Sequence, residues 1–272
     1  LVRQYSLCND PRETQRYLIA VMHTADSRGG SRAMHQVVNV GDCIEIGPPR
    51  NHFPLAPGAA RSLLLAGGIG ITPIICMSER LAGDRADFSV HYCARSPQRA
   101  AFVQRIAQSG YADRVTFHYS EGTQEQRVDL RGLLAAPDGR THLYVCGPAG
   151  FMDAVIAAAL AHGWCEDQVH REYFAAAPRE HGGDTAFDIR IASSGAIVHV
   201  ASDVTALQAL AANGIALPSS CEQGVCGSCL TRVLGGEPDH RDLYLSAGQH
   251  ARNDQFTPCC SRSQSPMLTL DL

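Results

Sequence analysis

The sequence predicts a multidomain protein with three successive folded parts. Short β-rich runs up to about Leu55 predict part of an antiparallel β-barrel. Alternating strand and helix patterns then predict an α/β domain with a parallel sheet, and a glycine-rich cysteine loop lies in a further small β-rich part. We therefore expect domains at residues 1–57, 58–174 and 184–272, with an interdomain linker of polar residues and glycine at 175–183.

The barrel prediction depends on four short runs that turn residues separate. Asn9-Asp10-Pro11 and Ser27-Arg28-Gly29-Gly30 are such turns. The expected strands are 3–7, 16–22, 36–40 and 43–46. So few strands do not close a barrel, and the chain opens on Leu1 rather than Met. We therefore expect that the first strands of this domain are absent from the sequence.

The α/β prediction depends on apolar runs that end in glycine turns or precede helical patterns. Arg61–Ala66 runs into a glycine turn, and Pro73 follows near the first turn of the next helix, where its missing N–H costs nothing. We expect strands at 61–66, 88–93, 115–119 and 142–146, and helices at 73–81, 98–108 and 150–161. Ligands of such sheets bind beyond the carboxyl ends of the strands.

The last part begins with a predicted β-hairpin. Phe187–Ile191 and Ile197–Val200 alternate apolar and polar residues around the turn Ser193-Ser194-Gly195. Ser202-Asp203 is the expected cap of a helix that runs through Leu210. The cysteine loop follows this helix.

The cysteine loop has the spacing of a plant-type 2Fe–2S site. Three cysteines have the spacing C-x4-C-x2-C, and a fourth ligand is available far downstream in Cys259-Cys260. Gly224, Gly227 and Ser228 are small enough to let backbone N–H groups approach the sulfurs. Structural zinc prefers two short cysteine pairs, and unligated thiols in so glycine-rich a loop would make a poor core. The three clustered cysteines are Cys221, Cys226 and Cys229.

Composition excludes several classes of protein. The net charge of −4 has the wrong sign for a nucleic-acid-binding protein. The sequence contains no apolar run long enough for a membrane span and no signal peptide. An odd total of 11 cysteines is unsuited to a disulfide framework, so we expect a cytoplasmic protein. Residues from Asp184 onward are acidic overall, which suits either docking on a basic redox partner or a solvated surface.

Arg3-x-Tyr5-Ser6 resembles the flavin-binding signature of the ferredoxin–NADP reductase superfamily. The resemblance implies that Arg3 binds the flavin phosphate and that Tyr5 and Ser6 lie against the isoalloxazine. Backbone N–H groups of the Arg-Gly-Gly-Ser turn would form a second phosphate cradle. Either stretch alone is also typical of an exposed strand or turn. The implied flavin residues are Arg3, Tyr5, Ser6, Ala20, Val21, Gly29, Gly30, Ser31, Thr72 and Phe174.

Two further motifs resemble the nicotinamide half of the same superfamily. Gly67-Gly-Ile-Gly70-Ile-Thr-Pro would lie under the pyrophosphate, and Cys146 in Cys-Gly-Pro would lie by the nicotinamide. Without the resemblance, such glycines serve close packing and a buried cysteine is a core residue. The absence of an adjacent arginine pair for a 2′-phosphate favours NADH over NADPH. The implied NAD residues are Gly67, Gly68, Gly70, Pro73, Arg95, Ser96, Cys146, Gly147, Pro148 and Met152, and the implied catalytic residues are Ser6, Thr72 and Cys146.

Flavin, nicotinamide and iron–sulfur motifs in this order resemble the family of phthalate dioxygenase reductase and vanillate O-demethylase reductase. The resemblance implies FMN as the flavin, a β-grasp ferredoxin domain at the C-terminal end, and Cys259 rather than Cys260 as the fourth ligand. NADH gives two electrons at once and the cluster accepts one, so the flavin must stand between them. The implied partner is a Rieske oxygenase that acts on a small aromatic compound, and the implied state is a monomer. Alternatives are a reductase for a ferredoxin or a diiron hydroxylase, or a non-catalytic electron carrier.

Overall fold

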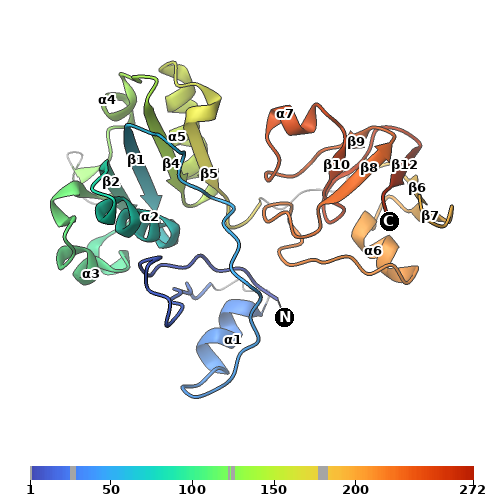
Figure 1. Cartoon of the computed structure of the whole chain (residues 1–272), viewed down its shortest axis with the longest axis horizontal. Helices are drawn as coiled ribbons and strands as arrows, with labels where there is room; N and C mark the ends of the chain where they lie inside the picture. Colours follow the sequence, from blue (N-terminus) through green and yellow to red (C-terminus); the bar gives the residue numbers. More distant parts are fainter. Residues whose placement is uncertain (1, 25–28, 122, 124–125, 177–182) are drawn as a thin grey trace. The chain divides into compact units, whose positions relative to one another are not determined.

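The computed structural model describes residues 2–24, 29–121, 123, 126–176 and 183–272. It divides into two compact units (Figure 1). The first unit contains Tyr5–Phe174, and the second contains Ala175–Leu272 together with Val2–Gln4. Most of the predicted linker, residues 177–182, lies outside the described residues.

The first unit is built on a five-stranded parallel sheet, as the strand and helix pattern predicts. Its strand order is β3-β2-β1-β4-β5. The first strand, β1, is the middle strand of the sheet. The chain adds β2 and β3 on one side of it and then β4 and β5 on the other side. The strands are β1 Arg61–Gly67, β2 Asp87–Ala94, β3 Val115–Tyr119, β4 Thr141–Cys146 and β5 Val169–Glu172.

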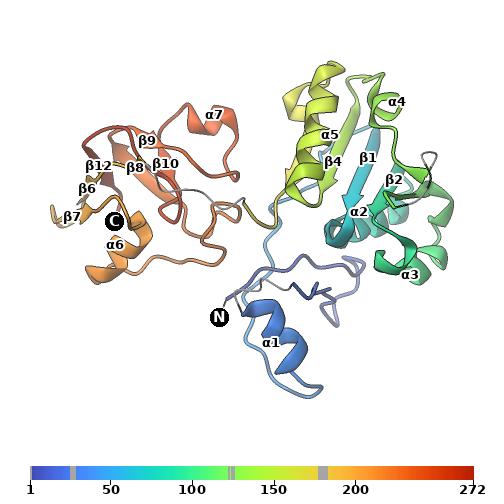
Figure 2. The same ribbon diagram turned by 180° about the vertical axis from the view of Figure 1, so that it is seen from behind.

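Helices cover both faces of this sheet (Figures 1 and 2). Leu64 and Ala66 of β1 pack in one core with α2 (Ile71–Gly83). Leu63 and Leu65 point to the opposite core, which α5 (Ala149–Ala161) covers. A strand that is buried on both faces must be apolar at every position, which explains the unbroken run of apolar residues in β1.

The predicted helix at residues 98–108 is wrong in extent. The chain forms two short pieces instead, because Phe102 between them has a left-handed backbone with φ 63°. The Tyr92 hydroxyl accepts a hydrogen bond of 2.9 Å from the N–H of Ala101, which fixes the break. The short helical elements of this unit are η1 Gly68–Gly70, η2 Pro97–Arg99, α3 Val103–Ala107, η3 Ala112–Arg114, α4 Leu130–Leu134 and η5 Glu166–Gln168.

The barrel strands predicted before residue 57 are not formed. Among residues 2–24 and 29–57 the structure shows no strand, and its one helix is α1 (Gly30–Gln36). A β-strand is stable only when a neighbouring strand pairs with its backbone, and none of these segments pairs in that way. Their apolar side chains consequently stay exposed, as at Val37, Ile44 and Ile46.

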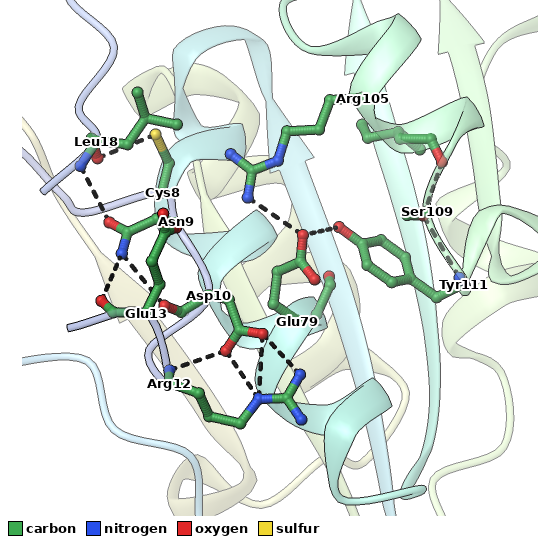
Figure 3. Close-up of polar contacts among 12 residues, drawn as sticks. Cys8, Asn9, Asp10, Arg12, Glu13, Leu18, Glu79, Arg105, Ser109 and Tyr111 are labelled. Atoms are coloured by element: carbon green, nitrogen blue, oxygen red, sulfur yellow. Dashed lines mark hydrogen bonds and ion pairs between the residues drawn. The ribbon is translucent and has the colours of Figure 1, made fainter. Parts of the chain in front are cut away.

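Residues 8–18 fold into a hydrogen-bonded turn beside α2 (Figure 3). Cys8 N donates to the carbonyl of Leu18 at 2.9 Å, and Leu18 N donates to Asn9 Oδ1 at 3.0 Å. The Arg12 guanidinium lies over Gly83 at the end of α2, close enough to leave no room for a Cβ there. The irregular start of the chain is therefore held to the α/β layer by specific contacts.

The second unit is a mixed five-stranded sheet with one helix packed on it. Its strand order is β10-β8-β12-β6-β7, in which β12 runs parallel to β6 and the other pairs are antiparallel. The hairpin of β6 and β7 is formed with the predicted bounds. A second, two-stranded sheet pairs β9 with β11. The elements are β6 Phe187–Ile191, β7 Ile197–Val200, α6 Ala206–Ala212, β8 Thr231–Gly235, β9 Pro238–Asp239, α7 Ala247–His250, β10 Gln255–Phe256, β11 Arg262–Ser263 and β12 Met267–Leu270.

The helix α6 begins later than predicted. Its cap is Thr205 rather than Ser202-Asp203, because the Thr205 hydroxyl accepts from Gln208 N while the Gln208 side chain accepts from Thr205 N. Leu210 and Ala209 of α6 then pack on the sheet in the core of this unit. The cysteine loop leaves this helix.

Candidate functional site

The cysteine loop brings its sulfurs together with that of Cys259. Cys226, Cys229 and Cys259 are buried, and Cys221 is partly buried. The Cys221 side chain is in hydrogen-bond contact with those of Cys226 and Cys259, and Cys229 is in contact with Cys259. Four thiols from two distant parts of the chain thus meet at one point.

Contacts among these thiols lower the pKa of Cys221 and Cys229 and raise the pKa of Cys226 and Cys259, so the negative charge is concentrated on the first two sulfurs. The thiols of Cys226 and Cys259 lower the pKa of Cys221 by hydrogen bonding, and burial opposes them. Backbone N–H groups approach at 3.4 Å, from Gln223 to Cys221 Sγ and from Ser228 to Cys226 Sγ. Four converging thiols with backbone donors aimed at them are the donor set that a 2Fe–2S cluster requires. The residues present therefore fit the cluster.

Two glycines let the loop close around this point. Gly224 and Gly227 have φ 71° and 66°, a region that L side chains rarely adopt. A Cβ on Gly224 would lie 3.0 Å from the Cα of Asp242, and a Cβ on Gly227 would overlap the ring of Tyr244. The small residues of the loop are therefore needed for both backbone conformation and space.

The neighbours Cys259 and Cys260 face different partners. Cys259 contacts Cys221 and Cys229, whereas Cys260 Sγ lies against Gly224 and 3.3 Å from Thr257 Oγ1. Cys259 is thus the better placed fourth ligand, although the two cysteines also contact each other.

In the first unit, the two glycine motifs meet at the carboxyl ends of β1 and β4. A Cβ on Gly70 would overlap the carbonyl oxygen of Cys146. The Phe151 ring of α5 lies over both strand ends, since Cβ atoms on Gly67 and Gly147 would be 2.7 and 2.8 Å from its Cδ1. The predicted nicotinamide motifs therefore form one surface at the edge where parallel sheets bind ligands. Gly68 and Pro73 lie in η1 and the first turn of α2, and Pro148 is the residue before α5.

One of the predicted NAD residues, Met152, lies away from this surface. Met152 is fully buried in the core beneath α5, so its side chain packs in the protein interior. Arg95 follows the end of β2, and the Ser96 carbonyl accepts a hydrogen bond of 3.0 Å from Arg99 N. Because β2 is the neighbour of β1, Arg95 and Ser96 lie along the same edge of the sheet.

Ser6 donates a hydrogen bond of 3.0 Å to the carboxyl group of Glu172, at the end of β5. Cys146 is fully buried, and burial followed by the charge of Glu172 raises the pKa of its thiol. Burial also raises the pKa of Glu172, and the Ser6 hydroxyl opposes this. Glu172 was missed because the strand that it ends, β5, was not among the predicted strands. The third predicted catalytic residue, Thr72, is buried and donates to the Ile69 carbonyl at 3.0 Å.

The raised pKa of Glu172 predicts a specific pH dependence of stability. A carboxyl group of this kind contributes stability that is fully present below its ordinary pKa of 4.5 and is lost as pH rises through the higher folded-state pKa. Urea unfolding of wild type and Glu172→Gln over a pH series above 4.5 measures the difference. We expect wild type to lose stability relative to the variant as pH rises. If the free energies of unfolding of wild type and Glu172→Gln changed with pH in the same way, the raised pKa of Glu172 would be contradicted.

The predicted flavin residues before the sheet form a second group. His35 Nε2 is 2.8 Å from the carbonyl of Val21, and Ser31 Oγ is 3.2 Å from Thr24 Oγ1. These contacts place Ala20 and Val21 beside Gly29, Gly30 and Ser31 at the start of α1, where Gly29 has φ 93°. Arg28 lies outside the described residues.

The other flavin predictions lie near the ends of the first unit. Tyr5 is partly exposed, and Phe174 is exposed at the last position of the unit. Arg3 belongs to the segment Val2–Gln4 that groups with the second unit, and its guanidinium donates to the Val2 carbonyl at 2.7 Å.

Comparison with known proteins identifies the family. Residues 189–264 match the family described as 2Fe-2S iron-sulfur cluster binding domain, and residues 43–169 match the N-terminal domain of dimethylamine monooxygenase subunit DmmA-like proteins. The chain is 53% identical to a vanillate O-demethylase oxidoreductase of Pseudomonas sp. (strain HR199 / DSM 7063), over all of this chain and 86% of that protein. The chain belongs to this family of reductases. A phthalate 4,5-dioxygenase oxygenase reductase subunit of Pseudomonas putida is 36% identical over all of this chain and 83% of its own length.

A solved structure extends the relationship to the fold. The structure described as phthalate dioxygenase reductase, a modular structure for electron transfer from pyridine nucleotides to the iron–sulfur cluster, matches 99% of this chain and 83% of its own, with TM-score 0.70 and 35% identity. The predicted family, the modular fold class and the predicted oxidoreductase function are thereby confirmed. The family match over residues 189–264 agrees with the cluster that the description of this structure names, and the phthalate relative is named as the reductase subunit of an oxygenase. Among the described residues, no helix is long and apolar enough to cross a membrane.

Proposed function

We propose that this reductase takes electrons from NADH and delivers them to a separate Rieske oxygenase that acts on a small aromatic compound. The observation that carries the proposal is the convergence of four thiols in the second unit. The aromatic substrate is supported by the names of the vanillate and phthalate relatives. We further propose that the protein is cytoplasmic, because its eleven cysteines, all of which the structure describes, form no disulfide. The monomeric state that the resemblance implies is part of the same proposal.

The flavin and the cysteine loop have separate roles in this proposal. When bound, FMN accepts the two electrons of NADH together and releases them singly to the cluster. Cys221, Cys226, Cys229 and Cys259 hold the cluster, and the N–H groups of Gln223 and Ser228 stabilise its negative charge. This division of labour assigns residues 184–272 as the ferredoxin domain and residues 58–174 as the NAD domain.

The first unit binds the two organic cofactors. Backbone N–H groups of the glycine turn after β1 hold the pyrophosphate of NADH, with Arg95 and Ser96 near its ribose. The Gly29-Gly30-Ser31 turn binds the flavin phosphate. Tyr5, Ser6, Thr72 and Phe174 line the flavin ring. Glu172 accepts the Ser6 hydrogen bond and keeps that hydroxyl in one orientation.

The visible spectrum of the purified protein tests the proposal. We expect flavin and iron–sulfur absorption bands that both bleach when NADH is added without oxygen. A colourless protein would restore the zinc interpretation of the cysteines, and a brown protein that does not respond to NADH would favour a non-catalytic electron carrier.

The identity of the acceptor requires a second assay. Oxygenases for vanillate and for dimethylamine, each supplied with this reductase and NADH, should differ in product formation. Turnover of the aromatic substrate supports the proposal. Turnover of the amine alone would favour the monooxygenase class that the match over residues 43–169 describes.

A further inference from the structure

The second unit contains a histidine–aspartate cluster apart from the cysteines. His240, Asp242 and His250 each offer one ligand atom, and these atoms lie within 4.8 Å of one another. Asp242 Oδ1 is 3.2 Å from His250 Nε2 and 3.8 Å from His240 Nδ1. The two imidazole rings are nearly parallel, with centroids 4.4 Å apart. The two distances show that His250 Nε2 and His240 Nδ1 lie near the same oxygen, Asp242 Oδ1.

His240 is held with an unprotonated nitrogen toward this oxygen. Its side chain is 9% exposed, and its Nε2 lies 3.2 Å from Asn253 Oδ1. An amide oxygen only accepts hydrogen bonds, so Nε2 carries the proton of the neutral ring and Nδ1 carries a lone pair. Nδ1 is buried and has no hydrogen-bond partner among the described residues. In the neutral ring with this tautomer, the Nδ1 lone pair faces the carboxylate oxygen, which is unfavourable unless a proton or a metal cation lies between them.

Asp242 is oriented by the backbone. Its side chain is fully buried, and Oδ2 accepts hydrogen bonds from Tyr244 N at 3.1 Å and Leu245 N at 2.7 Å. Oδ1 is left pointing toward the two histidines. The guanidinium of the adjacent Arg241 is directed away to Asp184 and Asp239, each at 2.6 Å. A single negative charge therefore stands between two imidazoles.

We propose that His240, Asp242 and His250 bind one divalent transition-metal ion, for which Zn²⁺ is the best match. Ligand atoms at about 2.0–2.1 Å from a tetrahedral zinc ion are roughly 3.3 Å apart. Asp242 Oδ1 lies 3.2 and 3.8 Å from the two histidine nitrogens, and all three ligand atoms lie within 4.8 Å of one another, so the stacked rings turn toward the ion when it binds. The hydrogen bond from His240 Nε2 to Asn253 is the outer contact typical of a metal-bound histidine. The His250 side chain is 29% exposed, so ions reach the site from solvent and water completes the fourth position.

The metal would stabilise the cysteine loop through the neighbouring segment, Leu243 and Tyr244. Leu243 N donates to the Gly224 carbonyl at 3.0 Å, and the Tyr244 ring fills the space beside Gly227. The ion would connect the segment of Leu243 and Tyr244 with α7, because His250 is the last residue of α7. It is therefore a structural ion rather than part of the electron path.

Calorimetric titration of the FMN- and cluster-loaded protein with Zn²⁺ tests the site. The exposed thiols Cys43 and Cys165 are first changed to serine, because they also bind zinc. In this background we expect one tight site, which His250→Asn weakens by more than about 100-fold. Asn253→Gly keeps the left-handed backbone at φ 52° and removes the acceptor, so it should weaken binding by about 10- to 100-fold.

The matched control is His199→Asn, which removes the histidine of the exposed His199–Asp188 pair in the same unit. This variant should bind Zn²⁺ as tightly as the background. Diffraction at the zinc absorption edge from a zinc-soaked crystal should show a peak bonded to His240 Nδ1 and His250 Nε2. Equal zinc affinity of the background and His250→Asn, or no peak between these atoms, would overturn the proposal.

Discussion

Cys259→Ser is expected to lose the 2Fe–2S cluster, whereas Cys260→Ser is expected to retain it. The reason is the direction of the two side chains, since Cys259 meets Cys221 and Cys229 while Cys260 lies against Gly224 and Thr257. A serine oxygen is a poor substitute for a thiolate on iron. Iron and acid-labile sulfide per chain, with the visible spectrum, measure the loss directly.

The two variants control for each other because they change adjacent residues in the same way. Cys260→Ser should contain close to the wild-type amount of iron, and Cys259→Ser should contain little. The reverse result would make Cys260 the ligand. Wild-type iron content in both variants would mean that neither sulfur is required.

Gly70→Ala should strongly impair reduction by NADH. The new Cβ would overlap the carbonyl oxygen of Cys146, and this neighbour is backbone of a central strand rather than a flexible side chain. Overpacking of this kind costs about 1–3 kcal/mol of stability. A shift of about 1 Å at the nicotinamide surface would lower the rate on the order of 100-fold. Thermal unfolding and NADH-dependent ferricyanide reduction measure the two effects.

Gly150→Ala is the matched control for this substitution. Gly150 lies in the first turn of α5, and a Cβ there would meet nothing within 4 Å. Alanine at a compatible helical position stabilises a protein by about 0.4–1 kcal/mol, so this variant should keep full activity. Wild-type activity in Gly70→Ala would show that the glycine turn does not position the nicotinamide.

The elements that the sequence predicts well are those with a strong local pattern. The parallel sheet was predictable because every residue of β1 after Arg61 is buried and all of them except Ser62 are nonpolar. The hairpin of Phe187–Ile191 and Ile197–Val200 was predictable because its residues alternate. In each case the burial of the strand determines which residue types occur along it.

The elements that the sequence mispredicts depend on distant partners. The runs before residue 57 have strand-forming residues but no paired neighbour, so β propensity alone did not make strands of them. The helix predicted over residues 98–108 is broken at Phe102, next to which the Tyr92 hydroxyl of β2 accepts a hydrogen bond from the backbone of Ala101. Neither the missing partner strand nor the Tyr92 contact can be recognised in a local sequence pattern.

The candidate site shows the same division. Cysteine spacing identified Cys221, Cys226 and Cys229 because one loop supplies all three. Glu172 was missed, because its importance depends on Ser6, which lies 166 positions earlier in the chain. His240, Asp242 and His250 were missed for a related reason, since a turn and a short helix bring them together.

The position of Phe151 links the mobility of two strand ends. The Phe151 ring, carried by α5, covers Gly67 at the end of β1 and Gly147, the residue after the neighbouring strand β4. A sliding or tilting of α5 would therefore uncover both glycines at the same moment. The rims of β1 and β4 consequently loosen or tighten as a pair, and amide hydrogen exchange at the two glycines should rise and fall together.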